Sequence, residues 1–307
     1  MVVDCFCGEK AVYAENKPLC KFHFSKWLND FVNERLDKHL KETEVIAVAV
    51  SGGKDSTALL DFTNKWAIKN KKKLFAISID EGIKGYKEYT LNFLRNFCKD
   101  NKIKLYIHSF KKETGKTLDE LVNIRDTQNF SEKACTICGI FRRYFLNKYA
   151  RERGATKILF AHNRDDEVQT FIMNLFVGNL PQMTIKGELG GIINHSKFVT
   201  RLKPLINIPE KALAIYSLLN YPNLPDTECP YLNESIRSMS RNFINELEKR
   251  KKGAKKNILE VYLKEILPTL KKNSKLIHSN IKECAECNEP SSKNKCNFCE
   301  LICRFFV

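Results

Sequence analysis

The sequence predicts an α/β protein, in which a doubly wound, mostly parallel sheet is flanked by a zinc finger at each end of the chain. Short apolar runs alternate with helical segments between residues 45 and 176. A Ser-Gly-Gly turn follows the first of these runs, and cysteines cluster near both termini. Strands that alternate with helices are typical of a parallel sheet covered by helices on both faces.

Four strands are expected in this central part. Residues 45–50 are a continuous run rich in β-branched side chains, which is typical of a buried parallel strand. The other three strands are expected at 74–79, 104–108 and 157–161. Helical spacing indicates helices at 57–69, 86–101, 140–153, 165–176 and 204–219. Two basic amphipathic helices are expected after them, at 234–252 and 258–270.

The charge of the chain favours a polyanionic partner. The formal net charge is +16, and lysines are concentrated in 249–256 and 271–272. A solvated lysine-rich face is the alternative, but so large an excess favours nucleic acid. There is no apolar run of about 18 residues and no basic segment followed by an apolar one at the start. We therefore expect a cytoplasmic protein that does not associate with a membrane.

Residues 51–56 form a candidate phosphate cradle between a strand and a helix. The residues are Ser51, Gly52, Gly53, Lys54, Asp55 and Ser56. Glycines let backbone N–H groups approach an anion, and the helix N-terminus adds partial positive charge. The spacing is not that of a Walker A loop. The alternative is a tight turn that binds nothing, and the position of the motif between a strand and a helix argues against it.

Carboxylates follow two of the expected strands. Asp80 and Glu81 end the second strand, and Asp165 and Asp166 follow the fourth. The carboxyl ends of parallel strands line the ligand crevice of such sheets, so these groups can hold Mg²⁺ or position a substrate. A cap of the following helix is the alternative for Asp165.

The 12 cysteines indicate metal or thiol chemistry, because a reducing cytoplasm disfavours a disulfide framework. Two CxxC pairs with zinc-site spacing lie near the C-terminus. They are Cys284, Cys287, Cys296 and Cys299. A second zinc site near the N-terminus, with one residue between its first two thiols, is expected from Cys5, Cys7, Cys20 and His23.

Three further cysteines lie in the body of the chain. Cys135 and Cys138 precede an expected helix that carries Arg142 and Arg143, and a thiol near a helix N-terminus or an arginine has a lowered pKa. Cys229 lies in a turn about ninety residues later. Spacing alone leaves two possibilities open, a joint site or a CxxC pair with an unrelated buried cysteine.

In combination, these motifs resemble the PP-loop superfamily of N-type ATP pyrophosphatases, and within it the two-thiouridine synthetase group of tRNA 2-thiolation enzymes. The phosphate loop, Cys135-x-x-Cys138-Gly139, Cys229-Pro230 and both terminal clusters occur in the order found in that group. The resemblance implies a Rossmann-like PP-loop catalytic domain at 29–230. An N-terminal zinc finger (1–28), a basic helical tRNA-binding segment (231–275) and a zinc ribbon (276–307) complete the implied organisation.

The resemblance also implies the cofactors. Cys135, Cys138 and Cys229 would ligate a 4Fe-4S cluster, which leaves one iron without a protein ligand. ATP would bind with Mg²⁺ at residues 51–56, and Lys54 would hold its pyrophosphate. The catalytic and nucleotide-binding residues carried over are Lys54, Asp55, Arg142, Asp165 and Asp166, with the backbone near Ala49 and Ile79 at the adenine.

The implied activity is ATP-dependent 2-thiolation of a tRNA uridine, with sulfide or the thiocarboxylate of a ubiquitin-like protein as sulfur donor. The residues from Cys138 to Arg143, and the basic stretch 236–241, resemble the archaeal branch that acts on the wobble uridine. The alternatives are the T-loop uridine, a persulfide on Cys135 or Cys138 in place of the cluster, and a zinc-containing nucleic-acid-binding module without catalysis. A homodimer is expected as the commonest assembly.

Overall fold

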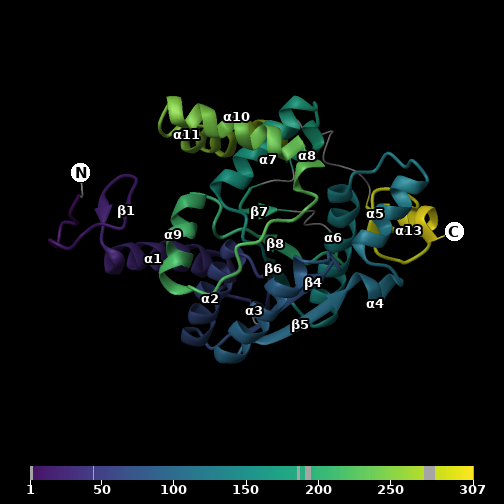
Figure 1. Cartoon of the computed structure of the whole chain (residues 1–307), viewed down its shortest axis with the longest axis horizontal. Coiled ribbons are helices and arrows are strands. Elements are labelled where there is room, and N and C mark those ends of the chain that lie inside the picture. The colour runs from purple at the N-terminus through teal and green to yellow at the C-terminus, as the bar shows by residue number, and fades with distance from the viewer. Residues whose placement is uncertain are drawn as a thin grey trace.

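A six-stranded sheet lies at the centre of the computed structural model, which describes residues 3–43, 45–184, 187–190, 195–234, 236–272 and 281–306 (Figure 1). In order across the sheet, its strands are β5 (Lys104–Ser109), β4 (Lys73–Asp80), β3 (Val45–Ala49), β6 (Lys157–Leu159), β8 (Thr200–Leu202) and β7 (Leu189–Gly190). All neighbours are parallel except β7 and β8. The predicted doubly wound parallel sheet is confirmed.

The direction of winding reverses beside β3. The chain moves from β3 outward through β4 to β5, then returns to the other side of β3 as β6. The chain therefore continues from β3 and from β6 toward opposite sides of the sheet, and open α/β sheets bind ligands at the carboxyl edge beside such a reversal. The short strands β7 and β8 were not predicted from the sequence, because two or three residues carry no periodic signal.

Helices cover both faces of the sheet. One face packs against α1 (Lys21–Leu40), α2 (Lys54–Lys69), α3 (Lys87–Asp100) and α9 (Glu210–Asn220). The other packs against α4 (Phe110–Thr114), α5 (Leu118–Thr127), α6 (Ala134–Glu152) and α13 (Asn297–Phe306). Alternation along β3 supplies both cores, since Ile46 and Val48 belong to the first and Ala47 to the second.

Helix α1 was missed by the sequence analysis although its pattern is visible. Every fourth residue from Phe24 to Leu40 is fully buried against the first core. The helix starts directly after Cys20 and runs without interruption across the expected domain limit at residue 28. The N-terminal module, with β1 (Tyr13–Ala14) and β2 (Pro18–Leu19), is therefore joined to the body by a helix, and Tyr13 packs on Phe24 with ring centroids 4.9 Å apart.

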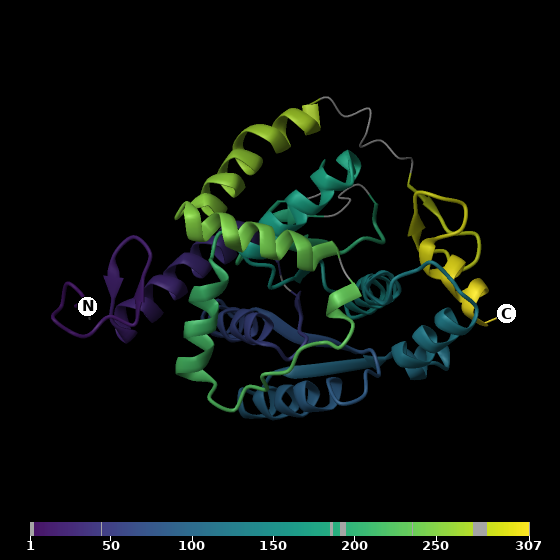
Figure 2. The same ribbon diagram turned by 45° about the horizontal axis from the view of Figure 1, so that its top comes forward.

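A third layer lies across α7 (Arg164–Phe176) at the carboxyl edge of the sheet (Figure 2). It consists of α10 (Ile236–Arg250), α11 (Ala254–Val261), a π-helical turn (Tyr262–Ile266) and α12 (Leu267–Lys272), and its core contains Val168, Ile244, Leu259 and Tyr262. Short helical turns, α8 (Leu180–Thr184) and η1 (Leu232–Glu234), flank it. The π-helical turn precedes Pro268, which has no N–H to donate to a regular α-helical ladder.

Two expected helix boundaries are wrong. The helix expected from Pro204 begins at Glu210, because Pro209 is its N-cap and the preceding residues form a turn. The helix expected from Ile140 begins at Ala134, so Cys135 and Cys138 lie inside its first two turns.

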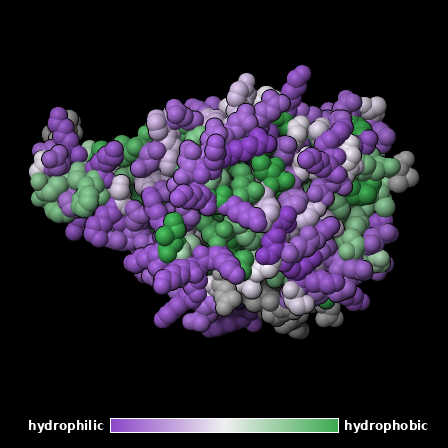
Figure 3. Space-filling view, turned by 90° about the horizontal axis from the view of Figure 1, so that it is seen from below, coloured by the Kyte–Doolittle hydropathy of each residue, from purple (hydrophilic) through white to green (hydrophobic). Residues whose placement is uncertain are grey.

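The C-terminal module lies at the opposite end of the molecule from the N-terminal one (Figure 1). Its short strands are β9 (Lys282–Glu283) and β10 (Pro290–Ser291). Helix α13 anchors it, since Leu301 and Phe305 are buried in the core of the second sheet face. Hydrophilic side chains cover most of the face in Figure 3, around an apolar area near its centre. Among the described residues, no helix combines the length and apolar character needed to cross a membrane.

A buried carboxylate joins α2 to α9. Asp61 accepts hydrogen bonds from the hydroxyls of Tyr216 at 3.0 Å and Tyr221 at 2.6 Å, and its other close partner is Lys65 at 2.8 Å. Both tyrosines belong to or follow α9, whose first residue reaches the phosphate loop. This cluster therefore sets the distance between α9 and the loop.

We expect Tyr216→Phe to lower the free energy of unfolding by about 1.5–3 kcal/mol, because it removes a donor to a buried charge. Urea unfolding monitored by circular dichroism measures the change. Tyr89→Phe, at a side chain that is 58% exposed, is the matched control and should change stability very little. Equal stability of the two variants would contradict a structural role for the Asp61 cluster.

Candidate phosphate and thiol site

The loop between β3 and α2 is held by its own hydroxyl groups. The Ser51 N–H donates to Ser56 Oγ at 3.2 Å, and the Gly53 N–H donates to Ser51 Oγ at 3.3 Å. The Ser56 hydroxyl donates to the Gly53 carbonyl at 3.0 Å. The result is a fixed concave turn at the N-terminus of a helix, which is an anion-binding geometry.

Gly52 is required by close packing. Its φ is +88°, and a Cβ at this position would lie 2.4 Å from the backbone oxygen of Thr90 on α3. Any larger residue would push the phosphate loop away from α3. The glycine that the sequence analysis assigned to phosphate contact thus has a packing role as well.

Lys54 faces two carboxylates at the start of α2. Its Nζ lies 2.8 Å from Glu210 Oε1 and 3.1 Å from Asp55 Oδ2. Burial alone would lower the pKa of Lys54, but the two carboxylates raise it overall. Glu210 was not identified from the sequence, because 156 residues separate it from Lys54 and only the fold brings them together.

Asp55 has the environment of a metal ligand. Its Oδ2 accepts from Lys54 and from the side-chain amide of Asn163 at 3.3 Å, whereas its Oδ1 is buried and has no hydrogen-bond partner among the described residues. Burial raises the pKa of Asp55 to about 6 despite the nearby lysine. A buried carboxylate oxygen with an unused lone pair, beside a phosphate loop, fits Mg²⁺.

Asp165 and Asp166 differ in their contacts. Asp165 Oδ2 accepts the backbone N–H of Glu210 at 2.9 Å, and Asp165 Oδ1 pairs with Lys255 of α11. Asp165 is not the helix cap. Asn163 caps α7, and Asp166 completes the capping box by accepting the Asn163 N–H at 3.2 Å.

Some cations of the basic segment 231–275 form part of the site. Lys255, which the sequence analysis placed on a tRNA-facing surface, is largely buried against Asp165. Arg237 of α10 donates to Thr170 Oγ1 at 2.9 Å, on α7. The third layer thus contributes two cations to the wall behind the carboxylates.

Glu81 links the end of β4 to α6. It is buried, and its carboxylate lies 3.0 Å from Lys87 Nζ and 3.3 Å from Arg142 Nε. Burial would raise the pKa of Glu81, but the two cations lower it overall. Arg142 is also close enough to Cys138 to oppose the rise in the pKa of that thiol.

The fold brings Cys229 to the two cysteines of α6. Cys135 Sγ lies 3.5 Å from the backbone oxygen of Tyr231, two residues after Cys229. Cys229 and Cys138 pack at the border of the same core. The possibility that Cys229 is unrelated to the CxxC pair is thereby disfavoured.

Two residues of α5, Arg125 and Asp119, hold the segment that carries Cys229 next to α6, and we call this pair the α5 bracket. Arg125 forms a bidentate ion pair with Glu234, at 2.7 and 3.3 Å, and Glu234 Oε2 also accepts the Ala134 N–H at the start of α6, at 2.9 Å. The Tyr231 hydroxyl donates to Asp119 Oδ1 at 2.6 Å. Helix α5 thus holds the segment that carries Cys229 against the start of α6.

The expected lowering of the thiol pKa values is wrong. Burial raises the pKa of Cys135, Cys138 and Cys229, that of Cys138 to about 12, and it outweighs the effect of Arg142. The trio is also absent from the described groups whose ligand atoms lie within 4.8 Å of one another. An all-thiol donor set is typical of iron–sulfur clusters.

Both terminal clusters can hold a metal ion. In each, four ligand atoms lie within 4.8 Å of one another, from Cys5, Cys7, Cys20 and His23 in the first and Cys284, Cys287, Cys296 and Cys299 in the second. In the first cluster His23 Nδ1 lies 3.3 Å from Cys20 Sγ, which identifies the ring nitrogen that faces the metal position. In the second, burial would raise the pKa of Cys284, but backbone N–H donors lower it to about 6. Tetrahedral sulfur and nitrogen sets of this kind suit zinc.

The two backbone positions assigned to adenine lie on neighbouring strands. Ala49 pairs with Ile77 in the β3–β4 register, so Ala49 and Ile79 both lie toward the carboxyl edge of the sheet. The phosphate loop and the Asn163–Asp166 turn meet at that edge through the Asp55 contact. The thiol trio lies beside the same edge, connected to it through Glu81 and Arg142. The role of the backbone at Ala49 and Ile79 stays a prediction.

Comparison with known proteins gives consistent matches. Residues 21–228 match the family described as PP-loop domain. A probable sulfurtransferase of Methanocaldococcus jannaschii is 34% identical over 98% of this chain and 87% of its own length. The tRNA-5-methyluridine(54) 2-sulfurtransferase of Pyrococcus horikoshii is 29% identical over 96% and 92%.

One solved structure is similar over almost the whole chain. It is the U34-tRNA thiolase NcsA from Methanococcus maripaludis with its 4Fe-4S cluster. The TM-score is 0.81 at 29% sequence identity, with 98% of this chain and 96% of that chain covered.

The packing at Gly52 generates a stability prediction. We expect Gly52→Ala to lower the free energy of unfolding by about 1–3 kcal/mol more than Gly85→Ala does, because only Gly52 has a backbone atom in the way. Gly85 is a matched control with φ +73° and open space at its Cβ position. Urea unfolding of both variants gives the difference. Equal losses would mean that φ strain alone sets the cost and that α3 does not restrain the loop.

Proposed function

The chain is an enzyme that belongs to the PP-loop domain family, and from this premise we propose that it is an ATP-dependent tRNA-uridine 2-sulfurtransferase. The observation that carries the proposal is the convergence of a phosphate loop and three distant cysteines at one edge of the sheet. A phosphate loop activates an oxygen for replacement, and thiols serve to bring in sulfur. A non-catalytic nucleic-acid-binding module has no use for that pairing.

The phosphate loop supports adenylation of the uridine. The backbone N–H of Gly52 at the helix N-terminus and the ammonium of Lys54 would bind the departing pyrophosphate, and Asp55 would hold Mg²⁺ through its Oδ1. ATP carries more negative charge than Glu210, so we propose that its phosphates replace that carboxylate at Lys54. Asp165 then has a positioning role, since it fixes Glu210 through the N–H of that residue.

The reaction follows from these positions. The uridine leaves the base stack, and its C2 oxygen attacks the α-phosphate while pyrophosphate departs. The new C2–O–P linkage makes AMP the leaving group, and sulfur forms a bond to C2 as the C2–O bond breaks. Arg142 would stabilise the phosphate charge that develops in the first step. Its ion pair with Glu81 orients the guanidinium toward the thiol side of the edge.

Cys135, Cys138 and Cys229 would hold a 4Fe-4S cluster. The all-thiol donor set and the cluster named in the similar Methanococcus maripaludis structure support the assignment. When bound by three thiolates, such a cluster supplies an iron with a free position for sulfur. A persulfide on Cys135 or Cys138 is the second candidate.

We propose the wobble uridine as the target. Arg142 stands where the resemblance implies an arginine in the wobble branch and a lysine in the T-loop branch. A relative named for position 54 and a similar structure named for position 34 are both 29% identical to this chain, so overall identity does not separate the two targets. The preference rests on Arg142 and on the 236–241 stretch. The T-loop uridine is the alternative target.

The partners follow from the same proposal. We propose tRNA as the substrate, zinc at both terminal clusters and a cytoplasmic site of action. Sulfide or a ubiquitin-like thiocarboxylate as sulfur donor, and the homodimer, stay predictions from the sequence.

The activity is tested by anaerobic assay with ATP, Mg²⁺, sulfide and an unmodified tRNA transcript. We expect 2-thiouridine and AMP to form together. Mass spectrometry of digested tRNA fragments should place the added sulfur at the wobble position. Lys54→Ala should lower AMP formation roughly 100-fold, because it removes a charge that stabilises the transition state. Lys69→Ala, at the exposed end of the same helix, is the control. If wild-type protein releases no AMP with any tRNA, the proposed function is wrong.

The α5 bracket allows the cluster to be tested separately. Glu234→Gln should weaken the ion pair with Arg125, loosen Cys229 and speed the loss of iron from reconstituted protein roughly tenfold. Iron analysis and the visible absorption of the cluster under a chelator measure this. Glu246→Gln, at an exposed side chain of α10, is the control. A wild-type protein that is free of iron and fully active would contradict the cluster and favour the persulfide.

A further inference from the structure

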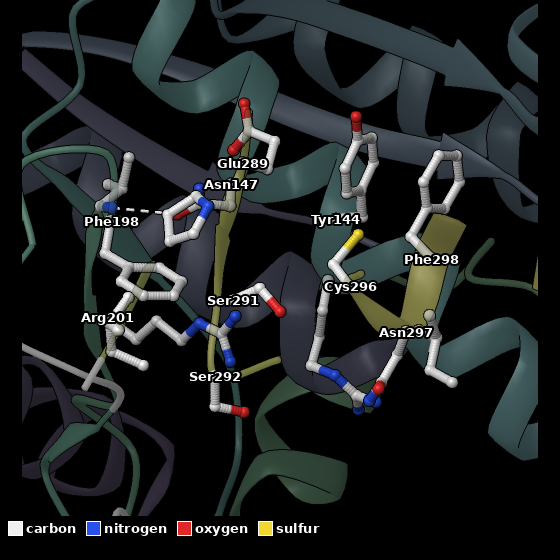
Figure 4. A pocket seen from close by; sticks show the side chains of 15 residues that line it. Tyr144, Asn147, Phe198, Arg201, Glu289, Ser291, Ser292, Cys296, Asn297 and Phe298 are labelled. Atoms are coloured by element: carbon white, nitrogen blue, oxygen red, sulfur yellow. Dashed lines mark hydrogen bonds between the residues drawn. The ribbon is translucent and has the colours of Figure 1, made fainter. Parts of the chain in front are cut away.

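A pocket outside the site described above lies between α6, the segment leading into β8, and the C-terminal module (Figure 4). Its volume is about 290 Å³. Helix α6 contributes Arg143 and Tyr144, and the β8 side contributes Phe198 and Arg201. The C-terminal module contributes Glu289, Ser291, Ser292 and Phe298. The pocket exists only because the C-terminal module is docked on α6.

Two guanidinium groups line this pocket without an acidic partner. Among the residues that the structure describes, neither Arg143 nor Arg201 has a carboxylate within ion-pair distance. The guanidinium carbon of Arg201 lies 5.8 Å from the centroid of the Phe160 ring. The carboxylate that lines the pocket, Glu289, is already engaged in a bidentate pair with Arg151.

The positive charge of Arg143 acts on Arg201. Burial lowers the pKa of Arg201 to about 10, and the positive charge of Arg143 adds to this effect. Arg143 packs over Gly139, where a Cβ would lie 3.1 Å from one of its guanidinium nitrogens. Two like charges that line one partly buried pocket are unfavourable unless an anion in the pocket offsets them.

The remaining walls suit a nucleoside. Tyr144 and Phe298 stack on one another with centroids 3.8 Å apart and form an aromatic wall. In the view of Figure 4, Arg201 and Ser292 lie on the other side of the pocket from this wall. The Ser291 oxygen accepts the Lys293 N–H at 3.0 Å, which leaves its hydroxyl hydrogen available to donate.

We infer that this pocket binds a backbone phosphate of the RNA substrate, with Arg143 and Arg201 as its charged donors and the Tyr144–Phe298 wall beside the attached nucleoside. The inference rests on the proposed function, because it takes tRNA as the substrate. Guanidinium groups bind phosphate oxygens in a bidentate manner, and aromatic side chains pack on nucleosides of splayed RNA.

The position of the pocket favours RNA over a free nucleotide. The phosphate loop at residues 51–56 already serves ATP in the proposed reaction. Arg143 directly follows Arg142, which pairs with Glu81 beside the thiol trio, so α6 connects the pocket to the reacting edge. A strand of RNA anchored here would bring a neighbouring nucleotide to that edge, whereas a free nucleotide would gain nothing from the connection.

The first test measures the affinity of a tRNA transcript by fluorescence anisotropy over a series of KCl concentrations. Arg201→Gln should weaken binding roughly tenfold and reduce the slope of log K against log salt by about one, because one phosphate contact is lost. Arg201→Lys should retain part of the affinity. Arg95→Gln, which removes an arginine bonded to Asn92 on the exposed side of α3, is the matched control and should change neither quantity.

A second measurement uses the unaltered protein, in case Arg201 variants fold poorly. Phenylglyoxal modifies accessible arginines, and mass spectrometry reports the modified positions. We expect tRNA, but not ATP, to protect Arg143 and Arg201. Protection by ATP, or modification unaffected by tRNA together with unchanged tRNA affinity of well-folded Arg201→Gln, would overturn the inference. Wild-type protein that thiolates tRNA under these outcomes keeps its proposed function; failure to bind tRNA at all removes both.

Discussion

The pairing of β3 with β4 on one side and β6 on the other is the constraint on which the site depends. These pairs place the loop after β3 and the turn after β6 at one edge, where Asn163 contacts Asp55. Other parts of the site are arranged around that contact. Helix α9 brings Glu210 to Lys54, and α6 carries the first two cysteines along the neighbouring wall. A slip in either pairing would separate the phosphate loop from its carboxylates.

The excess of positive charge is divided between two uses. Buried lysines next to the site are neutralised one by one, as in the pairs of Lys87 with Glu81 and of Lys203 with Glu167. Such pairs hold elements together and leave nothing for a ligand. In the part of the chain that the structure describes, the two arginines that line the pocket beneath the C-terminal module have no such partner, although they are partly buried. An overall charge of +16 therefore says less about ligand binding than the few cations that lack a carboxylate.

The sequence was most informative where a pattern is local. The apolar run at 45–50, the glycines of the phosphate loop and the CxxC pairs each carry their signal within a few residues. The fold confirms the strand, and it brings each terminal group of ligands close enough together to hold a metal ion. Contacts between distant segments could not be predicted. Neither the approach of Cys229 to α6 nor the contact of Glu210 with Lys54 has a local signature. Burial also reversed the expected thiol acidity, which proximity to a helix N-terminus had favoured.

The uninterrupted course of α1 has a mechanical consequence. Its 20 residues span about 30 Å at the α-helical rise, and they connect the N-terminal module to the sheet without a flexible linker. The length of α1 therefore sets the distance and the orientation of the N-terminal module relative to the sheet. Each residue added to α1 would turn the module by about 100° around the helix axis and advance it by about 1.5 Å. Any surface of that module is thus held at a fixed distance from the sheet.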